Sequence, residues 1–224
     1  MATILNIETT TTNCSVSLSK QGETLVLKED NSANYSHAES LHVFIDEVLK
    51  SSQMKPSDID AIAVSKGPGS YTGLRIGVSA AKGLCYALDK PLISVSTLES
   101  LSHQVQISDG IIVPMLDARR MEIYSAVFNS EHQIIRDIQA QILENNLFLE
   151  YLEKTKVYFI GNAVDKTKSI IKNKNAVFID NKLPSANELG KLAFHKFLRN
   201  DFENVAYFEP YYLKDFIDLR QVNP

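Results

Sequence analysis

The sequence has no tryptophan and only two cysteines, Cys14 and Cys85, among its 224 residues. Two cysteines do not make a disulfide framework, which indicates a reducing, cytoplasmic setting. No apolar run approaches the roughly 20 residues of a membrane-spanning helix, and the start MATILNIETT has no basic segment typical of an export signal. A basic excess is also missing, because the net charge is −4. That balance argues against a chain whose own surface mainly binds nucleic acid.

The remaining composition, 44% hydrophobic and 22% charged, is typical of a soluble globular protein. In the first half, the apolar pattern predicts elements in the order strand, strand, strand, helix, strand, helix, strand, helix, over residues 2–7, 13–18, 23–29, 36–49, 59–65, 72–88 and 92–95 and from Thr97 onward. The second half predicts the same order over 111–116, 121–128, 132–139, 144–154, 156–160, 164–172, 176–179 and 185–199. The sequence therefore predicts a duplicated α/β unit, with one subdomain over 1–104 and another over 105–224 whose tail is a candidate to pack back on the first.

Two such units side by side leave a cleft, which is a usual place for a ligand. The turn after the first strand of each unit is polar, and it gives five candidate residues for a nucleotide cleft: Glu8, Thr9, Thr10, Asp117 and Arg119. A carboxylate beside hydroxyls and backbone amides can hold a hydrated magnesium ion and phosphate oxygens. The alternative is that the Thr-rich turn satisfies its own backbone.

The stretch GPGSYTGLRIG, from Gly67 to Gly77, lies between a predicted buried strand and a helix. It is neither a Walker A loop, because no Gly-Lys-Ser/Thr follows at the required spacing, nor a complete dinucleotide fingerprint. Its backbone amides are candidates to receive an anion, and the alternative is a tight turn whose glycines supply positive φ angles. The candidate residues of this signature loop are Gly67, Pro68, Gly69, Ser70, Thr72, Gly73 and Arg75.

The helix after the loop has only a narrow polar stripe, formed by Arg75, Ser79, Lys82 and Tyr86. A helix with so little polar surface must be covered on more than the side that a sheet covers. Glycine inside a helix costs about 1 kcal/mol against alanine, so the helical glycines indicate a packing reason. Two interpretations stay open: contact with a helix of another chain, or burial under the first helix of this chain.

Other polar residues form no catalytic or metal-binding constellation. His37 and His42 are five positions apart, which does not place them on one helix face. The lysine run Lys166, Lys168, Lys172 and Lys174 is typical of a solvated helix face rather than of an RNA contact.

The segment GPGSYTGLRIGVSAAKGL resembles the central signature of the TsaB (YeaZ) family, with Tyr71 where the family usually has Phe. Residues Ile4–Leu18 resemble the family's opening strand pair, with Glu8 where an Asp is more usual. Further resemblance lies in Ser36–Leu49 (the first helix), Met115–Tyr124 (an Asp-Ala-Arg segment) and the terminal PYYLK.

The resemblance implies a duplicated actin- and Hsp70-like fold of the RNase H-like type. It also implies a cytoplasmic, non-catalytic subunit in the synthesis of N6-threonylcarbamoyladenosine next to the anticodon of tRNA. Such a subunit binds and activates its paralogue TsaD, the metal-binding transferase, and the ATPase TsaE joins the pair. The resemblance implies no membrane and no cofactor of the subunit's own. It leaves ATP or ADP as ligands of the complex, allows contact with tRNA only through that complex, and allows a homodimer in isolation.

The paralogue carries a paired-histidine metal motif on the equivalent first helix, whereas Ser40 and Leu41 follow His37 here at the +3 and +4 positions. The resemblance therefore predicts no catalytic residue and no metal ligand. It predicts a partner interface formed by Leu41, Phe44, Ile45, Val48, Leu74, Gly77, Ala80, Ala81 and Leu84. We expect Ala80→Arg or Gly77→Leu to abolish pairing with TsaD while the monomer stays folded. The alternative function is a nucleotide-dependent enzyme of the same fold, an ATP hydrolase or small-molecule kinase.

Overall fold

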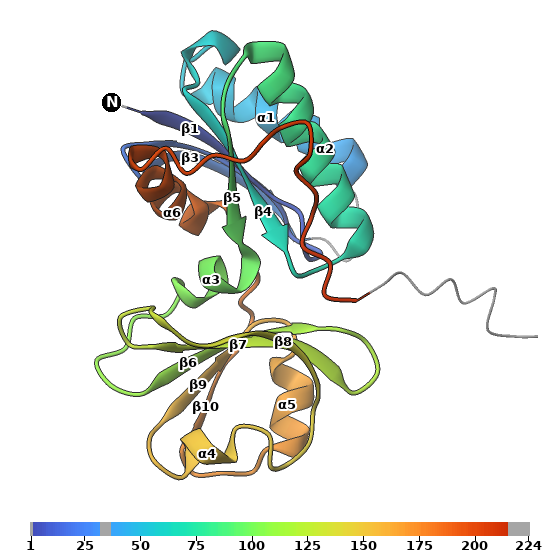
Figure 1. The fold of residues 1–224 in the computed structure, drawn as a ribbon, viewed down its shortest axis with the longest axis vertical. Coiled ribbons are helices and arrows are strands. Elements are labelled where there is room, and N and C mark those ends of the chain that lie inside the picture. Colours follow the sequence, from blue (N-terminus) through green and yellow to red (C-terminus); the bar gives the residue numbers. More distant parts are fainter. Residues whose placement is uncertain (1, 32–36, 215–224) are drawn as a thin grey trace, which may run out of the picture.

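The computed structural model describes residues 2–31 and 37–214, which form two α/β domains stacked end to end (Figure 1). The first half contains β1 (Thr3–Glu8), β2 (Cys14–Lys20), β3 (Glu23–Asp30), α1 (His37–Ser51), a 3-10 turn (Pro56–Asp58), β4 (Ala61–Gly67), α2 (Tyr71–Leu88), β5 (Leu92–Ser96) and α3 (Thr97–Ser102). The second half contains β6 (Ile111–Asp117), β7 (Glu122–Asn129), β8 (Ile134–Ile142), α4 (Leu149–Leu152), β9 (Val157–Ile160), α5 (Val164–Ile170), β10 (Ala176–Ile179) and α6 (Ala186–Leu198).

The order of strands is the same in the two sheets. The first sheet has the order β3-β2-β1-β4-β5. The second sheet has the equivalent order β8-β7-β6-β9-β10. In each sheet the first three strands are antiparallel and the last two run parallel to the first. The predicted duplication and the actin-like, RNase H-like fold are therefore confirmed.

One predicted helix is much shorter than expected. The sequence predicts a helix over 144–154, whereas α4 covers only Leu149–Leu152. Phe148 has a left-handed backbone (φ 72°), and its ring is buried in the second core. A residue in that conformation cannot continue a right-handed helix, so the segment before it forms turns. Ser36, the predicted start of the first helix, lies outside the described residues.

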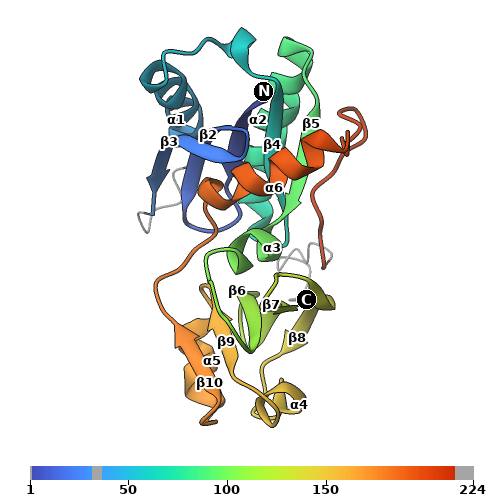
Figure 2. The same cartoon turned by 90° about the vertical axis from the view of Figure 1, so that its left-hand side faces the viewer.

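Helices α1 and α2 cover one face of the first sheet, and α6 covers the other face (Figures 1 and 2). Under α1 and α2 lies an aliphatic core that includes Leu5, Val16 and Leu41. Under α6 lies a second cluster of Ile4, Ile93 and Leu189 with smaller residues. The first sheet is therefore buried on both faces, as its apolar strands require.

Each half contributes its last helix to the opposite sheet. Helix α6 belongs to the second half in sequence, yet it packs on β1, β2 and β5. Gly190 permits this contact, because a Cβ there would lie 2.9 Å from the Cβ of Ser19. Helix α3 lies between the two sheets and packs through Leu98 and Leu101 on the second (Figure 1). The division at residue 104 follows the repeat in the sequence, whereas these two helices pack across it.

The segment after α6 returns along the first domain. Glu203 forms a bridge to Leu92 on β5. Lys82 of α2 donates to the carbonyl oxygens of Ala206 (3.3 Å) and Phe208 (2.8 Å). The tail therefore covers one flank of α2 as far as the described residues extend, and residues 215–224 lie outside them.

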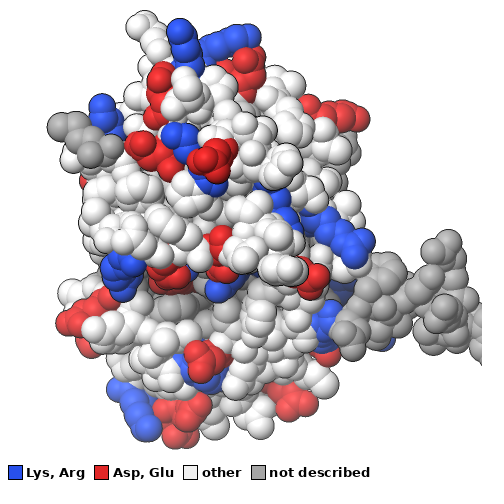
Figure 3. Space-filling model, turned by 45° about the horizontal axis from the view of Figure 1, so that its top comes forward, with Lys and Arg blue, Asp and Glu red and all other residues white. Residues whose placement is uncertain are grey.

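Charges of both signs are interspersed on the face shown in Figure 3, which has no extended field of one sign. Of the helices in the described ranges, none combines the length and apolarity that crossing a membrane demands.

Candidate functional site

Glu8, at the end of β1, is a fully buried carboxyl group. The Ser65 hydroxyl donates to its Oε2, and the Thr10 amide donates to its Oε1 at 2.6 Å. Burial raises the pKa of Glu8, and the hydrogen bonds from Ser65 and Thr10 offset part of that rise. The carboxyl group therefore holds the turn that follows β1 in a fixed conformation.

The glycine loop closes over this turn. The Ser70 amide donates to the Thr10 carbonyl at 2.7 Å, and the Thr9 hydroxyl donates to the Gly73 carbonyl at 2.7 Å. A Cβ at Gly69 would lie 2.6 Å from Thr10, and one at Gly73 would overlap the Thr9 carbonyl oxygen. The glycines thus allow backbone to pack on backbone, and they leave Glu8, Thr9 and Thr10 without solvent contact.

The other residues of the signature loop support the start of α2. Ser70 caps the helix by accepting from the Gly73 amide at 3.3 Å. Gly67 (φ +112°) is in the region that favours glycine, and a Cβ there would meet the Tyr211 carbonyl at 2.8 Å. Pro68 is buried, whereas Thr72 is exposed, as is Arg75, which lies over the Tyr71 ring at 4.2 Å.

The corresponding turn of the second domain is open. Asp117 and Arg119 are exposed. Asp117 Oδ1 accepts from the Arg119 amide at 2.7 Å and from Lys166 Nζ at 2.8 Å, while its own amide donates to Asn162 Oδ1. The five predicted nucleotide-cleft residues thus split into a buried set and an exposed set. The structure does not bring them together in one cavity.

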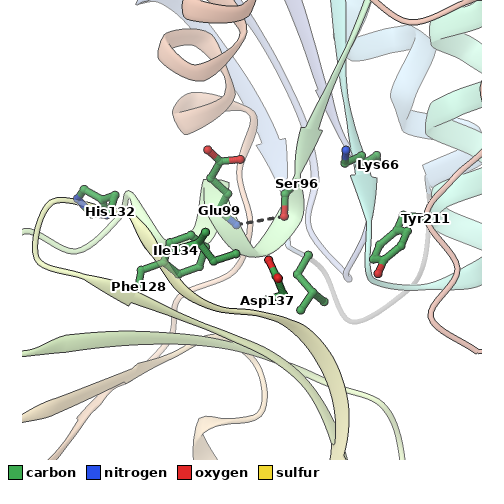
Figure 4. Close-up of a pocket in the computed structure, with 9 residues that line it drawn as sticks. Lys66, Ser96, Glu99, Phe128, His132, Ile134, Asp137 and Tyr211 are labelled. Atoms are coloured by element: carbon green, nitrogen blue, oxygen red, sulfur yellow. Dashed lines mark hydrogen bonds between the residues drawn. The ribbon is translucent and has the colours of Figure 1, made fainter. Parts of the chain in front are cut away.

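A cavity of about 560 Å³ does lie between the domains (Figure 4), and none of those five residues lines it. The residues around it come from β4, β5, α3, the β7–β8 hairpin and the tail: Lys66, Ser96, Glu99, Phe128, His132, Ile134, Asp137, Ile138 and Tyr211. The sequence analysis missed this set, because its members are far apart in the chain and form no motif. The only sequence signal is Lys66, a charged residue directly after a buried strand.

The residues of the predicted partner interface also differ in how deeply they are buried. Six of its nine residues are buried within the chain: Leu41, Ile45, Val48, Leu74, Gly77 and Ala81. The other three, Phe44, Ala80 and Leu84, are half-buried at the outer edge of the same core. Exposed Val43 and Tyr86 accompany them on α1 and α2.

Gly77 requires a correction. A Cβ at this position would overlap the Thr9 hydroxyl. Gly77→Leu therefore disturbs the chain's own core, so this variant does not separate a loss of pairing from a loss of stability. Ala80 meets no such obstacle from the turn, because it lies on the half-exposed side of α2.

Among the residues that the structure describes, no group of three or more His, Cys, Asp or Glu side chains is arranged to hold a metal ion. His37 is buried, and its Nε2 lies 2.7 Å from the Thr11 carbonyl oxygen. In the lysine run, Lys166 and Lys168 form ion pairs with Asp117 and Asp180. These contacts agree with a solvated helix face.

The family model TsaD, described as tRNA N6-adenosine threonylcarbamoyltransferase, matches residues 31–217. The tRNA threonylcarbamoyladenosine biosynthesis protein TsaB of Bacillus subtilis is 31% identical over 176 residues, which cover 76% of either chain. A tRNA N6-adenosine threonylcarbamoyltransferase of Staphylococcus epidermidis is 32% identical over 183 residues, but the match covers 75% of this chain and only 50% of that enzyme.

A solved structure from Pseudomonas aeruginosa, titled as an uncharacterized protein with similarity to peptidase YEAZ, has the same fold. Its TM-score is 0.83 at 24% identity, and the match covers 96% of this chain and 100% of that one. The TsaB of Haemophilus influenzae is 28% identical over 98% of this chain and 97% of its own length. The chain is similar to about half the length of the threonylcarbamoyltransferases, and it belongs to the TsaB family.

Proposed function

We propose that this chain acts in the biosynthesis of threonylcarbamoyladenosine in tRNA, as a non-catalytic subunit that binds and activates TsaD. The names of its TsaB relatives support the pathway. The similarity to half of the TsaD enzyme supports pairing, because two related domains can meet through equivalent surfaces around an approximate twofold axis.

The observation that carries this proposal is the apolar outer edge of α1 and α2. Val43 is 51% exposed and Tyr86 is 87% exposed, and half-buried Phe44, Ala80 and Leu84 accompany them. Apolar surface that a chain does not bury itself is typical of an interaction site. Small residues here form low ridges, so a partner helix can approach closely.

The closed turn around Glu8 supports a non-catalytic role. In a nucleotide-dependent enzyme, Glu8 and Thr10 would have to reach a metal ion or a phosphate. Here the Glu8 carboxyl group accepts hydrogen bonds from Ser65 and Thr10, and the glycine loop packs on the neighbouring Thr9 and Thr10. We therefore expect no cofactor of the chain's own, with ATP or ADP, TsaE and tRNA engaged only in the complex with TsaD. We expect the complex to act in the cytoplasm.

Size-exclusion chromatography with light scattering tests pairing. The wild-type chain mixed with TsaD of the same organism should elute as a heterodimer. Ala80→Arg should abolish that peak and leave the monomer folded, because a charge buried without a partner costs several kcal/mol. Asn145→Arg, an exposed position in the second domain, is the matched control and should pair normally. Separate elution of the wild-type chain, or unchanged pairing of Ala80→Arg, would refute this interface.

Activity tests the second part of the proposal. Transfer of the threonylcarbamoyl group to tRNA by TsaD and TsaE should require this chain and should be lost with Ala80→Arg. Glu8→Gln should retain activity, since the proposal gives Glu8 no chemical role. Loss of activity in a folded, pairing Glu8→Gln variant would favour the enzyme alternative.

A further inference from the structure

The interdomain cavity has one apolar side and one polar side. Phe128 and Ile134, from the β7–β8 hairpin, form the apolar side with Ile138. The ammonium group of Lys66 and the hydroxyl groups of Ser96 and Tyr211 lie on the side of the first domain (Figure 4). A volume of about 560 Å³ is within the range of pockets that bind small molecules, which are mainly apolar with a few converging polar groups.

The polar side is held in place before any ligand arrives. The Tyr211 amide donates to the Lys66 carbonyl at 2.7 Å, which fixes the tail beside the end of β4. Ser96 caps α3 by accepting from the Glu99 amide at 3.4 Å. These contacts position the Lys66, Ser96 and Tyr211 side chains. They engage the Ser96 hydroxyl group but not the ammonium or the phenol group.

Two titratable groups of the lining, Glu99 and His132, have interactions with residues outside it. The Glu99 carboxylate points toward α6 (Figure 4), and it interacts electrostatically with Lys196, Lys66 and Arg199. The His132 ring stacks on His103 with centroids 4.1 Å apart.

Among the described residues, Lys66 and Asp137 lack a close contact of this kind. Within residues 2–31 and 37–214, neither the Lys66 ammonium nor the Asp137 carboxylate has a hydrogen bond or an ion pair. They extend from different domains toward the same cavity (Figure 4). Lys66 interacts with Glu99 only beyond ion-pair distance, so its ammonium group can still form a charge-assisted hydrogen bond with an anionic ligand group.

We propose that this cavity binds a small zwitterion with an apolar body, namely an α-amino acid with a large apolar side chain. Its carboxylate would pair with Lys66, its ammonium group with Asp137, and its side chain would pack on Phe128 and Ile138. The site uses none of the α1–α2 residues. It therefore adds a binding activity beyond TsaD pairing, and its test uses the chain alone.

Ligand-detected NMR and thermal unfolding with L-phenylalanine test the site. The wild-type chain should bind saturably and its Tm should rise, because a ligand of the folded state alone stabilises it. Lys66→Met should weaken binding by about tenfold or more, since a charge-assisted hydrogen bond contributes about 1.5–3 kcal/mol. Asp137→Asn should weaken it by about twofold to fivefold, because Asp137 is exposed and solvent screens its charge. Asp109→Asn, which removes an exposed carboxylate outside the cavity, is the control and should bind like the wild-type chain.

Two analogues separate a zwitterion site from a merely apolar one. 3-Phenylpropionate lacks the ammonium group, so it should bind more weakly than L-phenylalanine and should not respond to Asp137→Asn. Phenethylamine lacks the carboxylate and should not respond to Lys66→Met. The proposal would be overturned if all three compounds bound equally well, or if all variants bound L-phenylalanine equally well. It would also be overturned if no saturable binding occurred at about 10 mM, because such contacts supply a higher affinity than that.

Discussion

The glycines on the inner and outer flanks of α2 have different surroundings. On the inner flank, Gly73 and Gly77 lie against Thr9, and a Cβ at either position would overlap that residue. On the outer flank, Gly83 has nothing within 4 Å, and Tyr86 beside it is 87% exposed. A helical glycine costs about 1 kcal/mol against alanine. The inner glycines offset that cost through packing within the chain, whereas Gly83 gains nothing from the residues that the structure describes.

The largest expected effect comes from filling the inner flank. Gly73→Ala should lower the free energy of unfolding by about 3 kcal/mol, because the new methyl group overlaps the backbone of Thr9, which cannot move aside cheaply. The bond from the Thr9 hydroxyl to the Gly73 carbonyl should be lost with it. Urea unfolding followed by circular dichroism measures the change. Wild-type stability in Gly73→Ala would mean that the loop does not pack on the turn.

A smaller effect is expected from the residue that supports this turn. Glu8→Ala leaves the Ser65 hydroxyl and the Thr10 amide buried without a partner, so it should destabilise the chain by about 2 kcal/mol. Glu8→Gln retains an acceptor and the same shape, so it should cost less than Glu8→Ala. Chemical denaturation of the two variants side by side checks the order. The reverse order would show that the negative charge, rather than the hydrogen bonds, holds the turn.

The pH dependence of stability sharpens the same point. Burial raises the pKa of Glu8 above its ordinary value of 4.5, so the folded chain holds this proton more tightly than the unfolded chain. The contribution of Glu8 to stability is therefore fully present below pH 4.5 and is lost as the pH rises through the raised pKa. Glu8→Gln does not titrate. The stability of the wild-type chain minus that of Glu8→Gln should fall as the pH rises above 4.5, and a constant difference would contradict the raised pKa.

Much of the fold could be predicted because its signals are local. Alternation in strands, helical period and Gly-containing breaks depend on neighbouring residues, and they predicted the order of elements in both halves. The prediction of a helix over 144–154 was wrong because the buried position of Phe148 outweighs the helical pattern around it. The packing of α6 on the first sheet depends on contacts such as Gly190 with Ser19, which are far apart in the chain.

The site was less predictable because its geometry depends on those distant contacts. The small residues of α2 predicted close packing, but helical period alone does not show which flank meets the sheet. Gly77 therefore appeared among the partner contacts although it packs on Thr9. Lys66 and Asp137 face one cavity only because two domains meet there, and no spacing in the sequence brings them together.

The smallest expected effect lies on the outer flank and has the opposite sign. Gly83→Ala should raise the free energy of unfolding by about 0.5–1 kcal/mol, because alanine favours the helix and the added methyl group meets nothing. Gly73→Ala, which makes the same change on the inner flank, is the variant to compare it with. If a TsaD helix packs closely against the outer flank, Gly83→Ala should also weaken heterodimer formation, as measured by titration with TsaD. A more stable monomer that pairs with unchanged affinity would mean that the partner helix crosses α2 away from Gly83, nearer Ala80.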